Sequence, residues 1–273
     1  MTLLTTSNPH PNRVIALKIF VPTVAFLVLA AWIINTPAGL LGKADAIAYA
    51  ICHRIAARSF SIGDRQMPLC ARCTGMYLGT LLGFLFQFKH EKRGGMPVLK
   101  IMILLGIFLV GFGIDGVNSY LHLIPNAPSL YTPENWLRLV TGTALGIGIA
   151  AVLLPVFNQS IWADWTDKPI LHSWKQVGAL VLIGAVLDIT VLSGNPILLY
   201  PLALLGSATV LVILGMIYTI VWLMLFKQEN KYHTIKEVWL PLLAGFTTAL
   251  IQISFMDWGR YALTGTWKGF FSS

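Results

Sequence analysis

The chain has 273 residues, of which 56% are hydrophobic and only 11% are charged, whereas about 25% of residues are charged in an average soluble domain. This composition excludes a soluble globular enzyme, a disordered chain and a small disulfide-framework protein, and it leaves a polytopic membrane protein. The formal net charge of +8 comes from 19 Lys and Arg against 11 Asp and Glu. In so apolar a chain, an excess of basic residues indicates how the chain is oriented in the membrane before it suggests binding to nucleic acid.

Seven stretches are apolar enough to cross a bilayer, since a hydrocarbon core of roughly 30 Å requires about 20 mostly apolar residues in a helix. The predicted fold class is therefore all-α, a transmembrane bundle of about seven helices. In chain order the predicted spans are Val14–Ile34, Pro68–Phe88, Val98–Val117, Trp136–Phe157, Gln176–Ser193, Pro196–Phe226 and Val238–Met256.

The loops between these spans alternate in basic charge, which predicts their orientation. The loops after the third and fifth spans hold no Lys or Arg. The N-terminal segment and the loops after the second, fourth and sixth spans are basic, through Arg13, Lys18, Lys89, Lys92, Arg93, Lys100, Lys168, Lys175, Lys227, Lys231 and Lys236. We therefore expect a multi-pass protein of the cell membrane with a cytoplasmic N-terminus.

The loop after the first span breaks this rule, because it lies outside and is nevertheless basic, with Lys43, Arg54, Arg58, Arg65 and Arg72. One explanation is that Ala38–Ile51 crosses the membrane and shifts the count. That segment has only about 14 residues and carries two charges, so it fits an interfacial or re-entrant helix better. We favour the other explanation, that a site at the outer face needs the arginines.

Acidic residues fall near the same membrane face. Asp115, Asp188 and Asp257 lie near the outer ends of the third, fifth and seventh spans, and Glu134 and Arg138 flank the start of the fourth. An ionisable group in a membrane segment is costly and usually has a partner or a function. The pattern predicts an outer cluster of Arg and Asp, which structural ion pairs at helix ends would explain equally well.

All three cysteines lie close together in the sequence, at Cys52, Cys70 and Cys73. Pro68 suits the first position of a helix, which would place Cys70 and Cys73 on one face of the first turn. Such a pair can hold one metal ion or form a reactive couple, with Cys52 or the adjacent His53 as a third ligand. Zinc bound by three such side chains keeps one position open. A disulfide with one free thiol, or inert buried cysteines, remain alternatives.

Two series of glycines repeat at a spacing of four residues. Gly75, Gly79 and Gly83 follow the cysteines, and Gly142 and Gly146 lie in the fourth span. Small residues at this spacing let two membrane helices approach closely. We interpret both series as packing faces rather than chemistry.

The cysteine segment resembles the signature of an uncharacterised prokaryotic integral-membrane family, a domain of unknown function that carries CHR…RSF…Q-x-PLCARCTG. Asp115-Gly116 and Asn135-Trp136-Leu137-Arg138 resemble later elements of that family. The resemblance covers roughly Ala38–Phe157, so we divide the chain into residues 1–37, 38–157 and 158–273. It supplies no reaction, but it implies one site made of Cys52, His53, Arg54, Arg58, Gln66, Cys70, Arg72, Cys73, Asp115, Asn135 and Arg138.

The leading hypothesis is a membrane enzyme with a zinc centre at Cys52, Cys70 and Cys73, and with His53 as the alternative to Cys52. Arginine suits an anionic group such as a lipid-linked phosphate, and Arg54, Arg58 and Arg72 are the predicted anion-binding residues. Asp115, as a base or an orienting group, and Arg138 are the candidate catalytic residues, with Gln66 and Asn135 also in the site.

Two other functions stay open on the sequence. One is a thiol–disulfide or quinone-linked redox protein of the membrane. The other is a transporter, or a structural subunit of a larger membrane complex. The sequence does not decide whether the protein is an enzyme. Membrane lipid is an expected partner, and nucleic acid is not, because the basic residues are not interleaved with aromatic ones.

Overall fold

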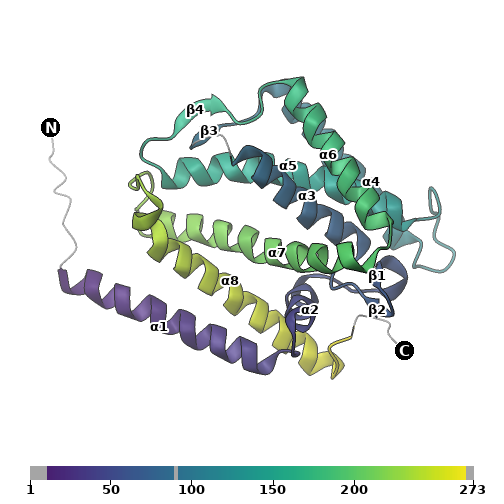
Figure 1. Cartoon of the computed structure of the whole chain (residues 1–273), viewed down its shortest axis with the longest axis horizontal. Helices are drawn as coiled ribbons and strands as arrows, with labels where there is room; N and C mark the ends of the chain where they lie inside the picture. The colour runs from purple at the N-terminus through teal and green to yellow at the C-terminus, as the bar shows by residue number, and fades with distance from the viewer. Residues whose placement is uncertain (1–10, 89–91, 269–273) are drawn as a thin grey trace.

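The computed structural model describes residues 11–88 and 92–268, apart from the side chains of residues 11–14. Lys89 and the side chain of Arg13, which contributed to the predicted orientation, lie outside this part. The helices are α1 (Pro11–Asn35), α2 (Leu40–Ile51), the short 3-10 helix η1 (Ala56–Arg58), α3 (Ala71–Gln87), α4 (Leu99–Leu121), α5 (Asn135–Ile161), α6 (Trp174–Leu192), α7 (Pro196–Leu225) and α8 (Ile235–Thr264) (Figure 1).

Two small sheets join this helical bundle. Strands β1 (Ser61–Ile62) and β2 (Arg65–Gln66) form an antiparallel hairpin, whose turn contains Gly63 at a φ of 60°. Strands β3 (Arg93–Gly95) and β4 (Thr166–Pro169) pair in parallel at the opposite end of the bundle. The all-α class predicted from the sequence is confirmed, with these short strands confined to the loops.

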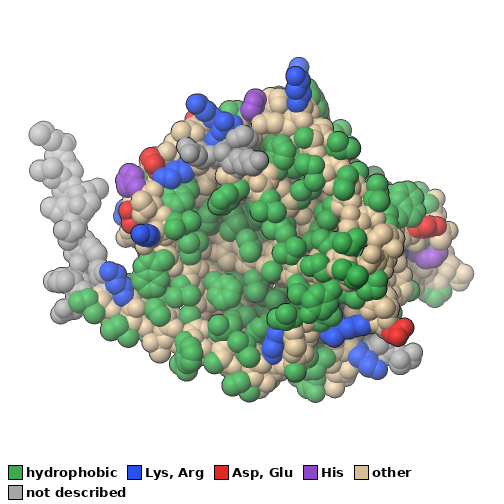
Figure 2. Space-filling model, in the orientation of Figure 1, with side chains coloured by type: hydrophobic (Ala, Val, Ile, Leu, Met, Phe, Trp, Pro, Cys, Tyr) green, Lys and Arg blue, Asp and Glu red, His purple; other side chains and the backbone are tan. Residues whose placement is uncertain are grey.

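Each of the seven predicted spans overlaps one helix of the structure. Six of these helices, α1 and α4 to α8, are long and apolar enough to cross a membrane. The remaining one, α3, has 17 residues and is therefore about 25 Å long, less than the hydrocarbon thickness of roughly 30 Å. Figure 2 shows a broad hydrophobic band between two charged ends, as a multi-pass membrane protein requires.

The closest helix pair is α3 with α5, and glycines make its contact possible. A Cβ atom on Gly79 would lie 2.5 Å from the Thr143 carbonyl oxygen, and one on Gly146 would lie 2.1 Å from the Met76 carbonyl oxygen. Gly75 and Gly142 are equally close to opposing backbone. The two series predicted as packing faces are therefore opposite sides of one interface.

Helix α2 is the segment whose membrane crossing was in doubt. Its 12 residues span about 18 Å, too short to cross. Ala46, Ile47 and Ala50 are buried against Val210 of α7 and Leu250 of α8. The helix therefore enters the bundle without traversing it, which agrees with the re-entrant interpretation.

The directions of the helices alternate, so their ends fall into two groups. The start of α3, the end of α4 and the start of α5 lie together, and the end of α8 meets the end of α2, at the end of the bundle that holds the hairpin, at lower right in Figure 1. All the residues predicted for the site lie at this end.

Replacing Gly146 by Ala tests the packing of α3 on α5. The added methyl group would meet the Met76 carbonyl, so the free energy of unfolding should fall by about 1–3 kcal/mol. Gly106→Ala is the matched control, because a Cβ atom there meets nothing within 4 Å. The measurement is thermal unfolding of both purified variants in detergent, and equal stability of the two would contradict the packing described.

Candidate metal centre and anion site

The three cysteines come from the ends of two helices. Cys52 is the C-cap of α2, Cys70 is the N-cap of α3, and Cys73 lies in the first turn of α3. The prediction that Pro68 is the first helical residue was wrong. The chain is still extended at Cys70, with φ −67° and ψ 163°, so the helix begins at Ala71.

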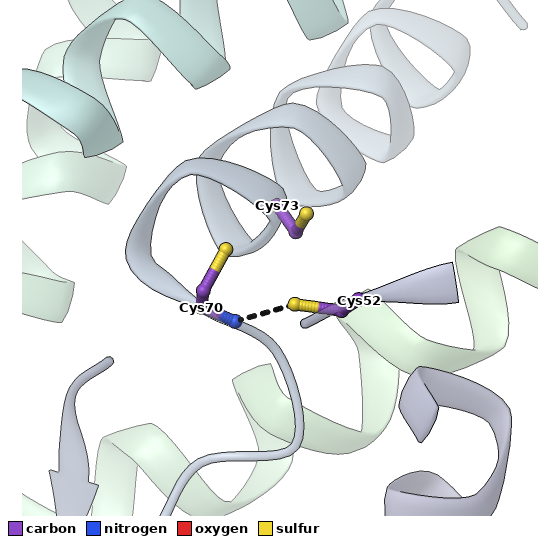
Figure 3. A group of neighbouring side chains, drawn as sticks. All are labelled: Cys52, Cys70 and Cys73. Atoms are coloured by element: carbon purple, nitrogen blue, oxygen red, sulfur yellow. Dashed lines mark hydrogen bonds between the residues drawn. The ribbon is translucent and has the colours of Figure 1, made fainter. Parts of the chain in front are cut away.

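The sulfur atoms of Cys52, Cys70 and Cys73 all lie within 4.8 Å of one another. Figure 3 shows the side chains converging, with the Cys70 backbone N–H donating to Cys52 Sγ at 3.4 Å. Sulfurs on a tetrahedral zinc, with Zn–S bonds of about 2.3 Å, stand about 3.8 Å apart. The three cysteines are thus close enough to hold a metal ion after a contraction of about 1 Å.

The structure distinguishes the two candidates for the third ligand. Cys52 is 3% exposed and belongs to the sulfur group. His53 is exposed, and its ring nitrogens are not among the clustered atoms. Of the two, the geometry brings only Cys52 to the other cysteines.

The surroundings of the sulfurs are mostly apolar, with Ala48, Leu69 and Tyr77 packed against them. Hydrogen bonds from the Cys70 and Cys73 thiols hold the pKa of the Cys52 thiol well below its ordinary value. The thiolate is the form that binds metals and reacts as a nucleophile. Cys52 is therefore the thiolate of the group, because the hydrogen bonds to Cys52, together with burial, raise the pKa of the Cys70 thiol to about 11 and raise that of Cys73 well above its ordinary value.

A residue that the sequence did not assign to the site holds Cys52 from α8. The Arg260 guanidinium donates to the carbonyl oxygens of Tyr49 at 2.5 Å and Cys52 at 2.6 Å, and lies 4.0 Å from the Tyr49 ring centroid. It thereby satisfies carbonyls at the end of α2 that the helix leaves without partners. No local sequence motif connects Arg260 with a cysteine 208 residues away.

An ion pair between α3 and α4 stands beside the cysteines. Arg72 Nε donates to Asp115 Oδ2 at 3.0 Å, and its Nη2 also contacts this oxygen. The Tyr131 hydroxyl donates to Asp115 Oδ1 at 2.9 Å. Asp115 is 1% exposed and both its oxygens are engaged, so its geometry favours the orienting role over that of a base.

Three arginines converge on Ser119, one turn beyond Asp115 on α4. Arg58 Nη2 donates to the Ser119 carbonyl oxygen at 2.6 Å. Arg72 and Arg138 donate to the Ser119 hydroxyl at 3.0 and 3.3 Å. Ser119 was not among the predicted site residues, although its spacing of four from Asp115 places both on one helix face.

Asn135 and Gln66 tie this region together through amide groups. Asn135 accepts from Arg138 Nη1 at 2.8 Å and donates to the Ala57 carbonyl at 3.2 Å. Gln66 donates to the Arg54 carbonyl and the Ser59 hydroxyl, both at 2.9 Å. The two amides fix the loop that carries Arg58 against α5 and the hairpin.

Arg54 is not brought to the three arginines. Its Nη2 donates to Asp45 Oδ1 at 2.8 Å and its Nη1 to the Trp267 carbonyl at 3.0 Å. It lines a separate open hollow of about 740 Å³, together with Arg65 and Lys268. An anion-binding role for Arg54 stays a prediction.

The predicted outer cluster of Arg and Asp forms only in part. Asp115 pairs with Arg72, and Asp257 lies on α8 one turn before Arg260. Asp188 instead accepts a hydrogen bond from the Thr143 hydroxyl at 2.6 Å, away from the arginines.

The arginine group carries more positive than negative charge. Arg58, Arg72 and Arg138 face the single carboxylate of Asp115, and that carboxylate pairs with Arg72. Among the described residues, no carboxylate oxygen lies within 4.0 Å of Arg58 or Arg138. Burial, and then the neighbouring Arg72 cation, lower the pKa of the Arg58 guanidinium. The arginine group therefore carries positive charge that no described carboxylate balances, and a bound anion would balance it.

Comparison with known proteins places this region in a family. An uncharacterized protein of Methanocaldococcus jannaschii is 30% identical over 112 residues, which are 41% of this chain and 67% of that protein. An uncharacterized protein of Methanothermobacter thermautotrophicus is 33% identical over 111 residues, which are 41% of this chain and 90% of that protein. No solved structure matches.

Residues 52–152 match the family described as "Predicted membrane protein (DUF2085)". The matched segment holds every residue predicted for the site, together with Ser119 and Tyr131, whereas Arg260 lies outside it. This chain therefore belongs to the DUF2085 family of multi-pass membrane proteins, whose function is unknown.

Proposed function

We propose that the protein is a membrane enzyme that uses a zinc centre at Cys52, Cys70 and Cys73 to act on an anionic, lipid-linked substrate. The observation that carries the proposal is the convergence of the three sulfur atoms within 4.8 Å beside a group of arginines with excess positive charge. Thiolate ligands in this number suit zinc, which supplies a Lewis acid with one position left for substrate or water.

The arginines support an anionic substrate next to the metal. Arg72 lies between Cys70 and Cys73 at the start of α3. It donates to the Ser119 hydroxyl, as Arg138 does, so the sulfur group and the arginine group are adjacent. A guanidinium group binds phosphate or carboxylate oxygens with two parallel hydrogen bonds. Arg58 and Arg138 take the binding role, and Asp115 orients Arg72.

The location of the site favours an amphiphile. The site lies where the helix ends meet the polar hairpin, and hydrophobic surface begins along the same helices, as at Ile114 and Val117 of α4. A substrate with a charged head and an apolar tail would satisfy both surfaces. We place this end at the outer membrane face, on the strength of the basic loops at the other end.

Elemental analysis of the purified protein tests the metal centre. We expect about one equivalent of zinc, and loss of most of it in Cys70→Ser and Cys52→Ser. His53→Ala is the matched control and should retain the metal. Bound metal stabilises only the folded state. Removing zinc from a solution whose free zinc concentration is 100 times the Kd should therefore lower the free energy of unfolding by about 2.7 kcal/mol. A metal-free protein with three intact cysteines contradicts the proposal.

Redox chemistry is a second candidate, favoured by the lowered pKa of Cys52 and by the proximity of all three sulfurs. Oxidation of Cys70 and Cys73 to a disulfide would pass two electrons and two protons to an acceptor of the quinone class. Alkylation of the cysteines in chelator, after treatment with a soluble quinone or with a reductant, separates the two functions. The zinc proposal predicts equal labelling, whereas labelling that falls after oxidation supports the redox function.

Cysteine reporters test the sidedness of the site. Glu134→Cys lies at the start of α5 beside the site, and Glu229→Cys lies in the loop between α7 and α8 at the other end; both positions are exposed. In intact cells a membrane-impermeant maleimide should label the first above the background of the unaltered chain and leave the second unlabelled. The reverse pattern would place the site in the cytoplasm.

A further inference from the structure

We infer that the arginine group around Ser119 binds a doubly charged phosphoryl group, the terminal phosphate of a monoester or a diphosphate, rather than a singly charged diester or carboxylate. The inference rests on the anion-binding part of the proposed function and names its ligand. Its basis is the number, geometry and pairing of Arg58, Arg72 and Arg138.

The charge count is the first step. Three guanidinium groups meet one carboxylate, which leaves two positive charges in this part of the structure. Arg138 is 6% exposed, so bulk water screens its charge poorly. A ligand with two negative charges balances the group, whereas a single negative charge leaves one cation uncompensated in a partly buried place.

Most N–H groups of Arg58 and Arg138 have no acceptor among the described residues and are available to a ligand. Arg58 donates one hydrogen bond to the described residues, at the Ser119 carbonyl, and a guanidinium has five N–H groups. Arg138 donates two hydrogen bonds, to Ser119 and Asn135. The remaining N–H groups of both arginines outnumber what a carboxylate accepts, and they suit the three terminal oxygens of a phosphoryl group.

The side chains of Arg58 and Arg138 are held in place before any ligand binds. Arg58 and Arg138 are anchored on the same serine, Arg138 is further held by Asn135, and Asn135 also holds the carbonyl of Ala57 next to Arg58. Donors that are fixed before binding lose little conformational entropy when the ligand arrives. Arg58 is half-buried and Arg138 is buried, so Arg58 is the more accessible of the two to a ligand.

Binding of matched probes to the protein as purified, in zwitterionic detergent, tests the inference. Phosphatidic acid carries a monoester phosphate, and phosphatidylglycerol with the same acyl chains carries a diester. At pH 8 the monoester is doubly charged, because its second pKa is about 6. We expect phosphatidic acid to bind at least tenfold more tightly, and equal affinities would overturn the inference.

Inorganic phosphate and phosphatidic acid identify the source of the phosphoryl group. Tighter binding of phosphatidic acid assigns the site to a lipid headgroup, and tighter binding of inorganic phosphate assigns it to the free ion. Either result retains the doubly charged ligand, provided that the preference over phosphatidylglycerol holds. Failure of both probes to bind overturns it.

Variants locate the binding. Arg58→Ala removes a half-buried side chain whose one hydrogen bond to the described residues goes to a backbone carbonyl, so the protein should fold while its affinity for phosphatidic acid falls about tenfold. Arg58→Lys restores the charge without the fork and should recover only part of that loss. Arg65→Ala is the matched control, since this exposed arginine of the hairpin pairs with Asp45 outside the group. An Arg58→Ala variant that binds as tightly as Arg65→Ala contradicts the assignment.

Zinc content, measured on the same samples, separates this inference from the proposed function. Normal zinc without preference for the monoester refutes the doubly charged ligand alone. A preference for the monoester in a protein without zinc refutes the metal centre and leaves the phosphoryl site standing.

Discussion

The close approach of α3 and α5 is the constraint on which the site depends. Opposing glycines let the backbones touch, and the Arg72 carbonyl would lie 2.2 Å from a Cβ atom on Gly142. That register brings the first turns of both helices together, so Cys70 and Arg72 of one stand near Arg138 of the other. A larger residue at one of these glycines would move Arg138 on α5 away from Cys70 and Arg72 on α3.

The second determinant is which arginines pair with a carboxylate within the apolar bundle and which do not. Asp115 and Arg72 neutralise each other, and Arg54 and Arg65 share Asp45. Arg58 and Arg138 lack such a carboxylate among the described residues and are held by neutral groups of Ser119 and Asn135 instead. A buried charge without a counter-ion is costly, and the anionic ligand that we propose would reduce this cost.

The family segment does not build the site alone. Helices α7 and α8 cover α2, and Arg260 fixes the carbonyl of Cys52. The matched residues 52–152 supply the cysteines and the arginines. Helices α7 and α8, which lie outside the matched segment, thus pack against α2 and hold Cys52 in place.

The sequence by itself determined the membrane class, the positions of the helices and the packing role of the glycines, because hydrophobic length and a four-residue spacing are local properties. It also identified the cysteines and most of the arginines. Only the tertiary structure decided that Cys52 rather than His53 lies with the other two cysteines, that Arg54 lies apart, that Ser119 contacts the arginines and that Arg260 contacts Cys52. These outcomes depend on contacts between residues distant in sequence, and no local pattern contains them.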